Sequence, residues 1–148
     1  MGVKLTVKLT KVPDFSRWKS QFAREVAEEM YEAVKDAKEE IVHETLRGVD
    51  YQGKAFVPYS KGYAKSKAKD TKFSLLRPNL WRTGHMIESL QVRVTRRGSK
   101  VIGILAPAGS GEALKVVWNM RLRKFFAISE TVRKDYQERM TNVFGRLK

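Results

Sequence analysis

The chain has 148 residues, of which 30 are Lys or Arg and 16 are Asp or Glu, so its formal net charge is +14. This length fits one domain, and we expect residues 1–148 to fold as a single domain. The absence of cysteine excludes disulfide bonds, thiolate catalysis and cysteine-based zinc sites. The longest stretch without a charge, residues 101–111, is shorter than the roughly 20 apolar residues of a membrane-spanning helix. We therefore expect a soluble protein made in the cytoplasm, with no membrane partner.

The charge is unevenly distributed along the chain. Residues 14–47 carry nine acidic and six basic residues, whereas residues 48–148 carry 21 basic and seven acidic ones. A strongly basic surface attracts oppositely charged partners over long distances, whatever the fold beneath it. The distribution therefore indicates a polyanionic or acidic partner that faces one side of the molecule.

The first predicted element is a β-strand over residues 3–10. Here apolar residues alternate with Lys and Thr in the run VKLTVKLT. A period of two residues is typical of a strand with one buried and one exposed face. Pro13 ends the pattern.

A long helix is predicted from Asp14, whose carboxylate can cap the first turn, to about Arg47, where Gly48 provides the stop. Apolar residues recur every three or four positions along it, namely Phe15, Trp18, Phe22, Val26, Met30, Val34, Ala37 and Ile41. Such a helix is roughly 50 Å long, which exceeds what the core of a small domain covers. We therefore expect part of this apolar stripe to contact something outside the monomer.

The opposite face of this helix carries a group of carboxylates, Glu25, Glu28, Glu29 and Glu32. Paired acids can catalyse hydrolysis, but they need a cleft that separates their pKa values. A helix face that carries both Glu and Lys is usually solvated. We expect either a solvated face or a docking surface for a basic neighbour.

Residues 48–78 are predicted to form mainly a long basic loop, with a short helix over residues 60–69 as an alternative. Aromatic residues are interleaved there with seven basic ones, Lys54, Lys61, Lys65, Lys67, Lys69, Lys72 and Arg77. Basic and aromatic side chains together can follow a nucleic-acid backbone and stack on bases. The other interpretation is a solvated lysine-rich loop whose aromatic side chains pack inward.

A short helix and a β-hairpin come next. The helix is predicted over residues 79–90 with Thr83 as its cap, and the hairpin over residues 91–106 with its turn at residues 96–99. Residues 113–118 fit a strand or a short helix equally well.

Ser129 is expected to cap the final helix, which continues to about Leu147. Phe125, Phe126 and Ile128 precede this helix and are predicted to fill the core. The order of elements predicts an α+β fold, in which a long N-terminal helix and a C-terminal helix pack on a small antiparallel sheet that contains the β-hairpin.

The sequence contains no pattern typical of a catalytic, cofactor-binding or metal site. His43 and His85 lack partners at the spacing that zinc sites and catalytic histidines use. The glycine-containing loop at residues 106–111 lacks the spacing of a phosphate-binding P-loop. We therefore expect no enzymatic activity, no cofactor, no metal and no small-molecule substrate.

Three segments resemble one family, the phage virion morphogenesis proteins, which are neck or tail-completion proteins of Mu-like and related tailed phages. Residues 48–60 (GVDYQGKAFVPYS) are similar to a glycine-rich segment of that family. Residues 80–90 (LWRTGHMIESL) resemble its L-x-x-T-G-x-M-x-x-S-L signature, and residues 123–129 (RKFFAIS) resemble the run before its last helix. A family member often has Arg-Pro-Phe where this chain has Arg-Lys-Phe.

The resemblance implies a non-catalytic virion subunit that is made in the host bacterial cytoplasm. It implies assembly into a ring, expected to be a hexamer, that joins the head connector to the tail and contacts other neck and tail proteins. Such a ring would surround packaged DNA, and a non-specific contact with it would explain the charge. The alternative is a sequence-independent nucleic-acid-binding protein. From the residues themselves, the acidic helix and the basic remainder supply two complementary surfaces for head-to-tail contacts.

Overall fold

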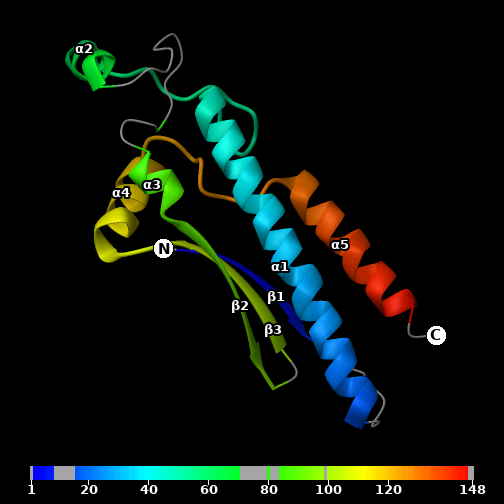
Figure 1. The fold of residues 1–148 in the computed structure, drawn as a ribbon. Helices are drawn as coiled ribbons and strands as arrows, with labels where there is room; N and C mark the ends of the chain where they lie inside the picture. Colours follow the sequence, from blue (N-terminus) through cyan, green and yellow to red (C-terminus); the bar gives the residue numbers. More distant parts are fainter. Residues whose placement is uncertain (1, 9–15, 71–79, 81–83, 99, 147–148) are drawn as a thin grey trace.

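A computed structural model describes residues 2–8, 16–70, 80, 84–98 and 100–146 (Figure 1). The elements in chain order are β1 (Val3–Lys8), α1 (Ser16–Arg47), α2 (Lys61–Asp70), α3 (His85–Glu88), β2 (Leu90–Arg97), β3 (Lys100–Pro107), α4 (Ser110–Met120) and α5 (Glu130–Gly145). The fold is α+β, with α1 and α5 packed on a small antiparallel sheet, as the sequence predicts.

The three strands form one antiparallel sheet in the order β1-β3-β2. Leu105 of the central strand pairs with Val3 of β1 and with Val92 of β2. Both the first strand and the hairpin are thereby confirmed. The hairpin turn is shorter than the expected residues 96–99, because pairing continues to the ends of both strands.

Helix α1 confirms the predicted long helix. It ends at Arg47, after which Gly48 adopts a φ of 75°, a left-handed conformation that glycine accepts without a steric penalty. The predicted cap, Asp14, lies outside the described residues.

Helix α1 is covered from two directions, by one face of the sheet and by α5 alongside it (Figure 1). From Phe22 to Ile41, every residue of its apolar stripe is at most 4% exposed. The expectation that part of the stripe contacts something outside the monomer is therefore wrong for these residues. Because both the sheet and α5 pack against α1, a longer part of the helix is buried than the core of a small domain was expected to cover. Phe15 and the side chain of Trp18 lie outside the described part.

Polar contacts fasten α5 to α1. The Ser129 hydroxyl accepts a hydrogen bond from the backbone N–H of Val132 at 3.2 Å, which confirms the predicted cap. The same hydroxyl donates to the Glu40 carboxylate at 2.8 Å. Farther along, Arg139 forms an ion pair with Asp36. The start of α5 is thus fixed both to its own first turn and to α1.

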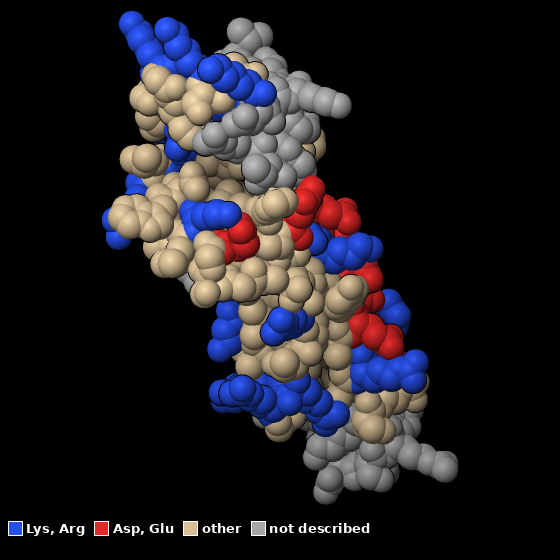
Figure 2. Space-filling model, turned by 60° about the vertical axis from the view of Figure 1, so that its left-hand side comes forward, with Lys and Arg blue, Asp and Glu red and all other residues tan. Residues whose placement is uncertain are grey.

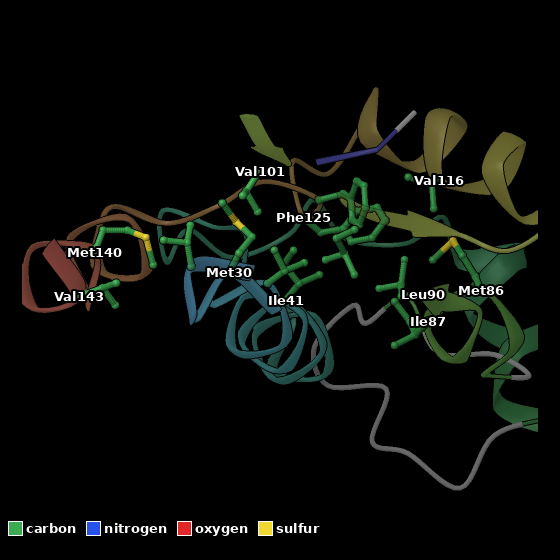
Figure 3. Close-up of a cluster of buried hydrophobic side chains, with 14 of the residues drawn as sticks. Met30, Ile41, Met86, Ile87, Leu90, Val101, Val116, Phe125, Met140 and Val143 are labelled. Atoms are coloured by element: carbon green, nitrogen blue, oxygen red, sulfur yellow. The ribbon is translucent and has the colours of Figure 1, made fainter. Parts of the chain in front are cut away.

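The core lies between α1, the sheet and the segment that leads into α5. Figure 3 shows Met30 and Ile41 of α1 among side chains from the sheet and from that segment, including Leu90 and Phe125. Phe125 is 2% exposed and Phe126 is 3% exposed, so the prediction that they fill the core is confirmed for both, whereas Ile128 is only half-buried.

The remaining helices differ from the predictions in detail. Residues 61–70 form α2, so the prediction of mainly a loop is wrong there and the alternative helix is confirmed. Helix α3 is much shorter than residues 79–90; it begins after Gly84, whose φ is 83°, and the predicted cap Thr83 lies outside the described residues. Residues 113–118 belong to a helix, α4. No helix in the described segments is both long and apolar enough to cross a membrane.

Candidate interaction surfaces

No group of three or more His, Asp or Glu side chains comes together as a metal site within the described residues. His43 is exposed and lies 3.1 Å from the Glu44 carboxylate, and His85 is exposed at the start of α3. Three surfaces of the described residues are candidates for contact with a partner.

The first surface is a groove of about 670 Å³ at the end of the molecule that holds α2, α3 and α4. Its described lining residues are Val57, Pro58, Tyr59, Ser60, Tyr63, Leu80, Gly84, Met86, Lys115, Asn119, Leu122 and Arg123. They include members of all three segments that carry the family resemblance. Segments that are far apart in the sequence therefore meet at one place.

In the wall of this groove, two cations contact one tyrosine ring. The Arg123 guanidinium carbon lies 4.8 Å from the Tyr59 ring centroid, and its Nη2 donates to the backbone oxygen of Val57 at 3.0 Å. On the same ring, Lys67 Nζ lies 4.6 Å from the centroid and donates to the Tyr59 hydroxyl at 2.8 Å. Cation–π contacts strengthen when desolvated, and Arg123 is only 8% exposed. These contacts therefore fix the conformation of the groove wall.

The candidate basic contacts in this region separate into three groups. Lys54, Lys61, Lys65 and Lys69 are exposed, as a contact with a partner requires. Lys67 is only 1% exposed, so its assignment as a partner contact is wrong; its ammonium group is used inside the chain, against Tyr59. The other two candidates, Lys72 and Arg77, lie outside the described residues.

Next to the groove, α4 exposes an apolar stripe, here called the α4 stripe. Leu114 and Trp118 are 59% and 61% exposed and, four residues apart, lie on one side of the helix; Leu122, in the turn that follows the helix end at Met120, is 66% exposed. Val116, on the other side, is fully buried. The Arg121 guanidinium carbon lies 4.4 Å from the Trp118 ring centroid.

The α4 stripe was missed by sequence reasoning. The spacing of four residues could have indicated it, but such a spacing places residues on one side only in a helix, and the sequence left residues 113–118 open between strand and helix. Val57 and Tyr63, also more than a third exposed, line the adjoining groove. Contiguous exposed apolar surface commonly marks a site of protein–protein contact.

The second surface is the acidic side of α1, which Figure 2 shows as red atoms mixed with blue along one flank. Part of its charge is neutralised within the helix: Arg24 pairs with Glu28 at 2.9 Å, and Lys35 pairs with Glu32 at 3.5 Å. Between them Tyr31 is 47% exposed.

A shallow hollow of about 500 Å³ accompanies this tyrosine, lined by Arg24, Ala27, Glu28, Glu29, Tyr31 and Glu32. Three of the four predicted acidic contacts are thus gathered around one aromatic ring. The fourth, Glu25, is half-buried and lies 3.4 Å from the Gln21 amide.

The third surface is the side of the sheet that faces away from α1, here called the basic sheet face. In an antiparallel sheet, directly opposed residues point to the same side. Three rows of opposed residues form the face: Lys4, Ile104 and Arg93; Thr6, Ile102 and Thr95; Lys8, Lys100 and Arg97.

The covered side of the sheet is identified by Gly103, which lies in the alternate set of rows. A Cβ at this position would lie 2.5 Å from a methyl of Val34 and 2.7 Å from the sulfur of Met30, both in α1. The rows with the cations therefore point away from α1. All five cations are exposed, and none of the three strands contains Asp or Glu.

The basic sheet face was also missed as a site, although its residues sit in runs predicted as strands. Alternation in VKLTVK and VRVTRR already places Lys or Arg on one side of each strand. Which strand lies beside which could not be read from the pattern. Figure 2 shows basic side chains gathered at the end of the molecule that holds the hairpin and, separately, at the end that holds α2.

Comparison with protein-family models, curated proteins and solved structures finds no match for this chain.

Proposed function

We propose that the chain is a non-catalytic structural subunit of a tailed-phage virion, which assembles into a ring at the neck or tail end. The single observation that carries the proposal is the convergence of three segments on one groove. Residues 48–60, 80–90 and 123–129 resemble one family of virion proteins, and each contributes to the groove lining. That the three segments form one surface supports a common role for them in assembly.

The groove and the α4 stripe have the character of one half of a protein interface. Apolar side chains are exposed, and they are flanked by Arg121 and by Lys115, which pairs with Glu112 at 2.7 Å. Protein interfaces are enriched in aromatic and arginine anchors surrounded by polar residues. Trp118 with Arg121 fits the description of such an anchor.

The other half is the acidic side of α1, with Tyr31 between carboxylates. The two surfaces differ in charge, and they lie on different parts of the molecule (Figure 1). A contact between unlike surfaces is heterologous, and it produces a closed ring when the rotation between neighbours closes. The proposed contact sets the α4 stripe of one copy against the Tyr31 side of the next.

Assembly is tested with the full chain by size-exclusion chromatography with light scattering and by negative-stain microscopy. We expect closed rings of uniform copy number. The double variant Leu114→Ser with Trp118→Ser should shift the protein to monomers while its circular dichroism stays unchanged. As a matched control, Gln137→Ser with Glu138→Ser changes two exposed positions of α5 and should leave the rings intact.

The pairing of the two surfaces is tested by charge reversal. Glu28→Lys with Glu32→Lys should weaken the rings, and adding Lys115→Glu with Arg121→Glu should restore them in part. A wild-type protein that stays monomeric at every concentration, or one absent from purified particles of the phage that encodes it, would refute the proposed function.

A further inference from the structure

The basic sheet face is not used by the proposed ring contact and needs an explanation of its own. Its three rows place Lys4 and Arg93 at one end, Lys8, Lys100 and Arg97 at the other, and two threonines between. Strands lie about 4.8 Å apart and rise about 3.4 Å per residue. The cations therefore outline a patch of roughly 10 by 13 Å.

The polar side chains of these three rows can all donate hydrogen bonds, and no carboxylate in the three strands neutralises them. Arg93 donates one such bond to the amide oxygen of Gln91, in the next row of the same face, at 2.8 Å. Lys, Arg and Thr are among the side chains that contact the phosphates of nucleic acids. The patch is also fixed in shape, because its residues belong to a sheet rather than to a loop. We infer that the basic sheet face binds the phosphate backbone of duplex DNA without reading its sequence.

Other partners fit the face less well. Proteins that hold single strands stack bases on aromatic side chains, and β1, β2 and β3 contain no aromatic residue. Binding at a membrane surface uses apolar side chains that insert between lipids. Here Ile102 is only 8% exposed, and threonines flank it in its row.

Protection of the sheet edges is the simplest competing explanation. Exposed edge strands commonly carry lysines that prevent pairing with other chains. This accounts for Lys4 and Lys8 on β1 and for Arg93 and Arg97 on β2, the other edge strand, but not for Lys100 in the central strand. The inference stands apart from the ring proposal, since a monomer would bind DNA through the same face.

The experiment measures binding of the full chain to a fluorescent duplex of about 30 base pairs by anisotropy, over a series of salt concentrations. Five phosphate contacts give a slope of log K against log salt of about −4.5, and a loss of about 500-fold in affinity between about 50 and 200 mM salt. Binding to a single strand of equal length should be weaker. Anionic phosphatidylserine vesicles should not compete at the same charge concentration.

Paired variants locate the contact. Lys4→Gln with Arg93→Gln, and Lys8→Gln with Arg97→Gln, should each reduce the magnitude of the slope by about 2. The matched control is Lys61→Gln with Lys65→Gln, which removes two exposed charges from α2 and should leave the slope unchanged. If the magnitude of the slope falls equally in the control and in the sheet variants, DNA does not bind specifically at the basic sheet face.

A second measurement uses the wild-type protein and so does not depend on how variants fold. Lysine acetylation read by mass spectrometry should show Lys4, Lys8 and Lys100 protected by DNA, and Lys61 and Lys65 modified as before. No binding at about 50 mM salt, where phosphate contacts are strong, protection confined to α2, or tighter binding to vesicles than to DNA would overturn the inference. Loss of DNA binding leaves ring formation untouched, so the two proposals fail separately.

Discussion

Gly103 lies at the closest approach between the sheet and α1. Any larger residue would bring a Cβ within 2.5 Å of Val34 and 2.7 Å of Met30. Overpacking of a well-filled core costs about 1–3 kcal/mol. We expect Gly103→Ala to lower the free energy of unfolding by that amount, measured by urea denaturation.

The matched control for this substitution is Gly111→Ala, in the first turn of α4. A Cβ there meets nothing within 4 Å, and alanine favours a helix over glycine by about 1 kcal/mol in a helix interior and less near its end. We expect a small gain in stability. Equal effects of the two substitutions would contradict the close contact at Gly103.

Tyr136 carries a buried hydroxyl that has no hydrogen-bond partner among the described residues. Burial raises the pKa of Tyr136 to about 12, because the neutral ring is favoured inside the protein. In the unfolded chain a tyrosine hydroxyl has its ordinary pKa of about 10. The stabilisation that comes from the raised pKa of Tyr136 is therefore complete below about pH 10 and is lost as the pH rises towards 12.

Replacing Tyr136 by Phe removes both the unpaired hydroxyl and its titration. We expect Tyr136→Phe to raise the free energy of unfolding by about 1 kcal/mol at neutral pH, and the difference from wild type to widen above about pH 10. Urea denaturation of both proteins at several pH values measures it. A difference that stays constant across the alkaline range would contradict the assignment.

Helix α5 depends on one side chain at its beginning. Ser129 caps the helix through Val132 and bonds to Glu40 of α1. Loss of a cap costs about 1 kcal/mol, and loss of a hydrogen bond to a charged group about 1.5–3 kcal/mol. We expect Ser129→Ala to lower the free energy of unfolding, measured by urea denaturation, by about 2.5–4 kcal/mol.

Two further substitutions separate these roles. Ser129→Thr keeps the hydroxyl and should cost much less than Ser129→Ala. Ser129→Asp keeps a capping acceptor but places a carboxylate against Glu40, and should be destabilising as well. Full stability of Ser129→Asp would show that the contact with Glu40 contributes little.

The elements that follow a clear period could be predicted from the sequence. The long helix was recognised from its apolar stripe, and the hairpin from alternation around Gly98, whose φ is 59°. Residues 113–118 could not be decided, because the run ALKVVW satisfies short stretches of either period. How much of α1 is covered was misjudged, since a pattern along one helix does not reveal how many layers pack on it.

The surfaces were less accessible to sequence reasoning than the fold. In the sequence Lys67 does not differ from its neighbours in a lysine-rich run. In the structure its side chain is buried and donates a hydrogen bond to Tyr59, eight residues earlier. The basic sheet face joins residues near the N-terminus to residues beyond position 90, so it depends on strand order. Charge counts indicate that cations exist; only topology shows which of them share a face.

At the scale of the whole molecule, the α4 stripe and the basic sheet face belong to different regions and share no residue. Substitutions at sites that share no partners have additive effects. We expect Leu114→Ser with Trp118→Ser to abolish rings and leave the salt slope of one monomer unchanged. Conversely, Lys8→Gln with Arg97→Gln should reduce DNA binding and leave rings intact, as light scattering and anisotropy on the same samples would show.

An effect of either substitution on both properties would mean that DNA and neighbouring copies compete for one region, or that assembly is needed for binding. Avidity would be the sign of the second case, because many weak faces joined in one particle bind a common duplex far more tightly than one face alone.

The pairing of β1 with β3 has a consequence for synthesis on the ribosome. Val3 pairs with Leu105, about 100 residues later in the chain. Translation proceeds at roughly 5–20 residues per second. For several seconds, therefore, the first strand and the apolar face of α1 are already synthesised while the central strand is not. Pairing across such a separation is also slow. The nascent chain therefore exposes an amphipathic helix with an uncovered apolar face before it can fold, and we expect a chaperone to bind it within that interval.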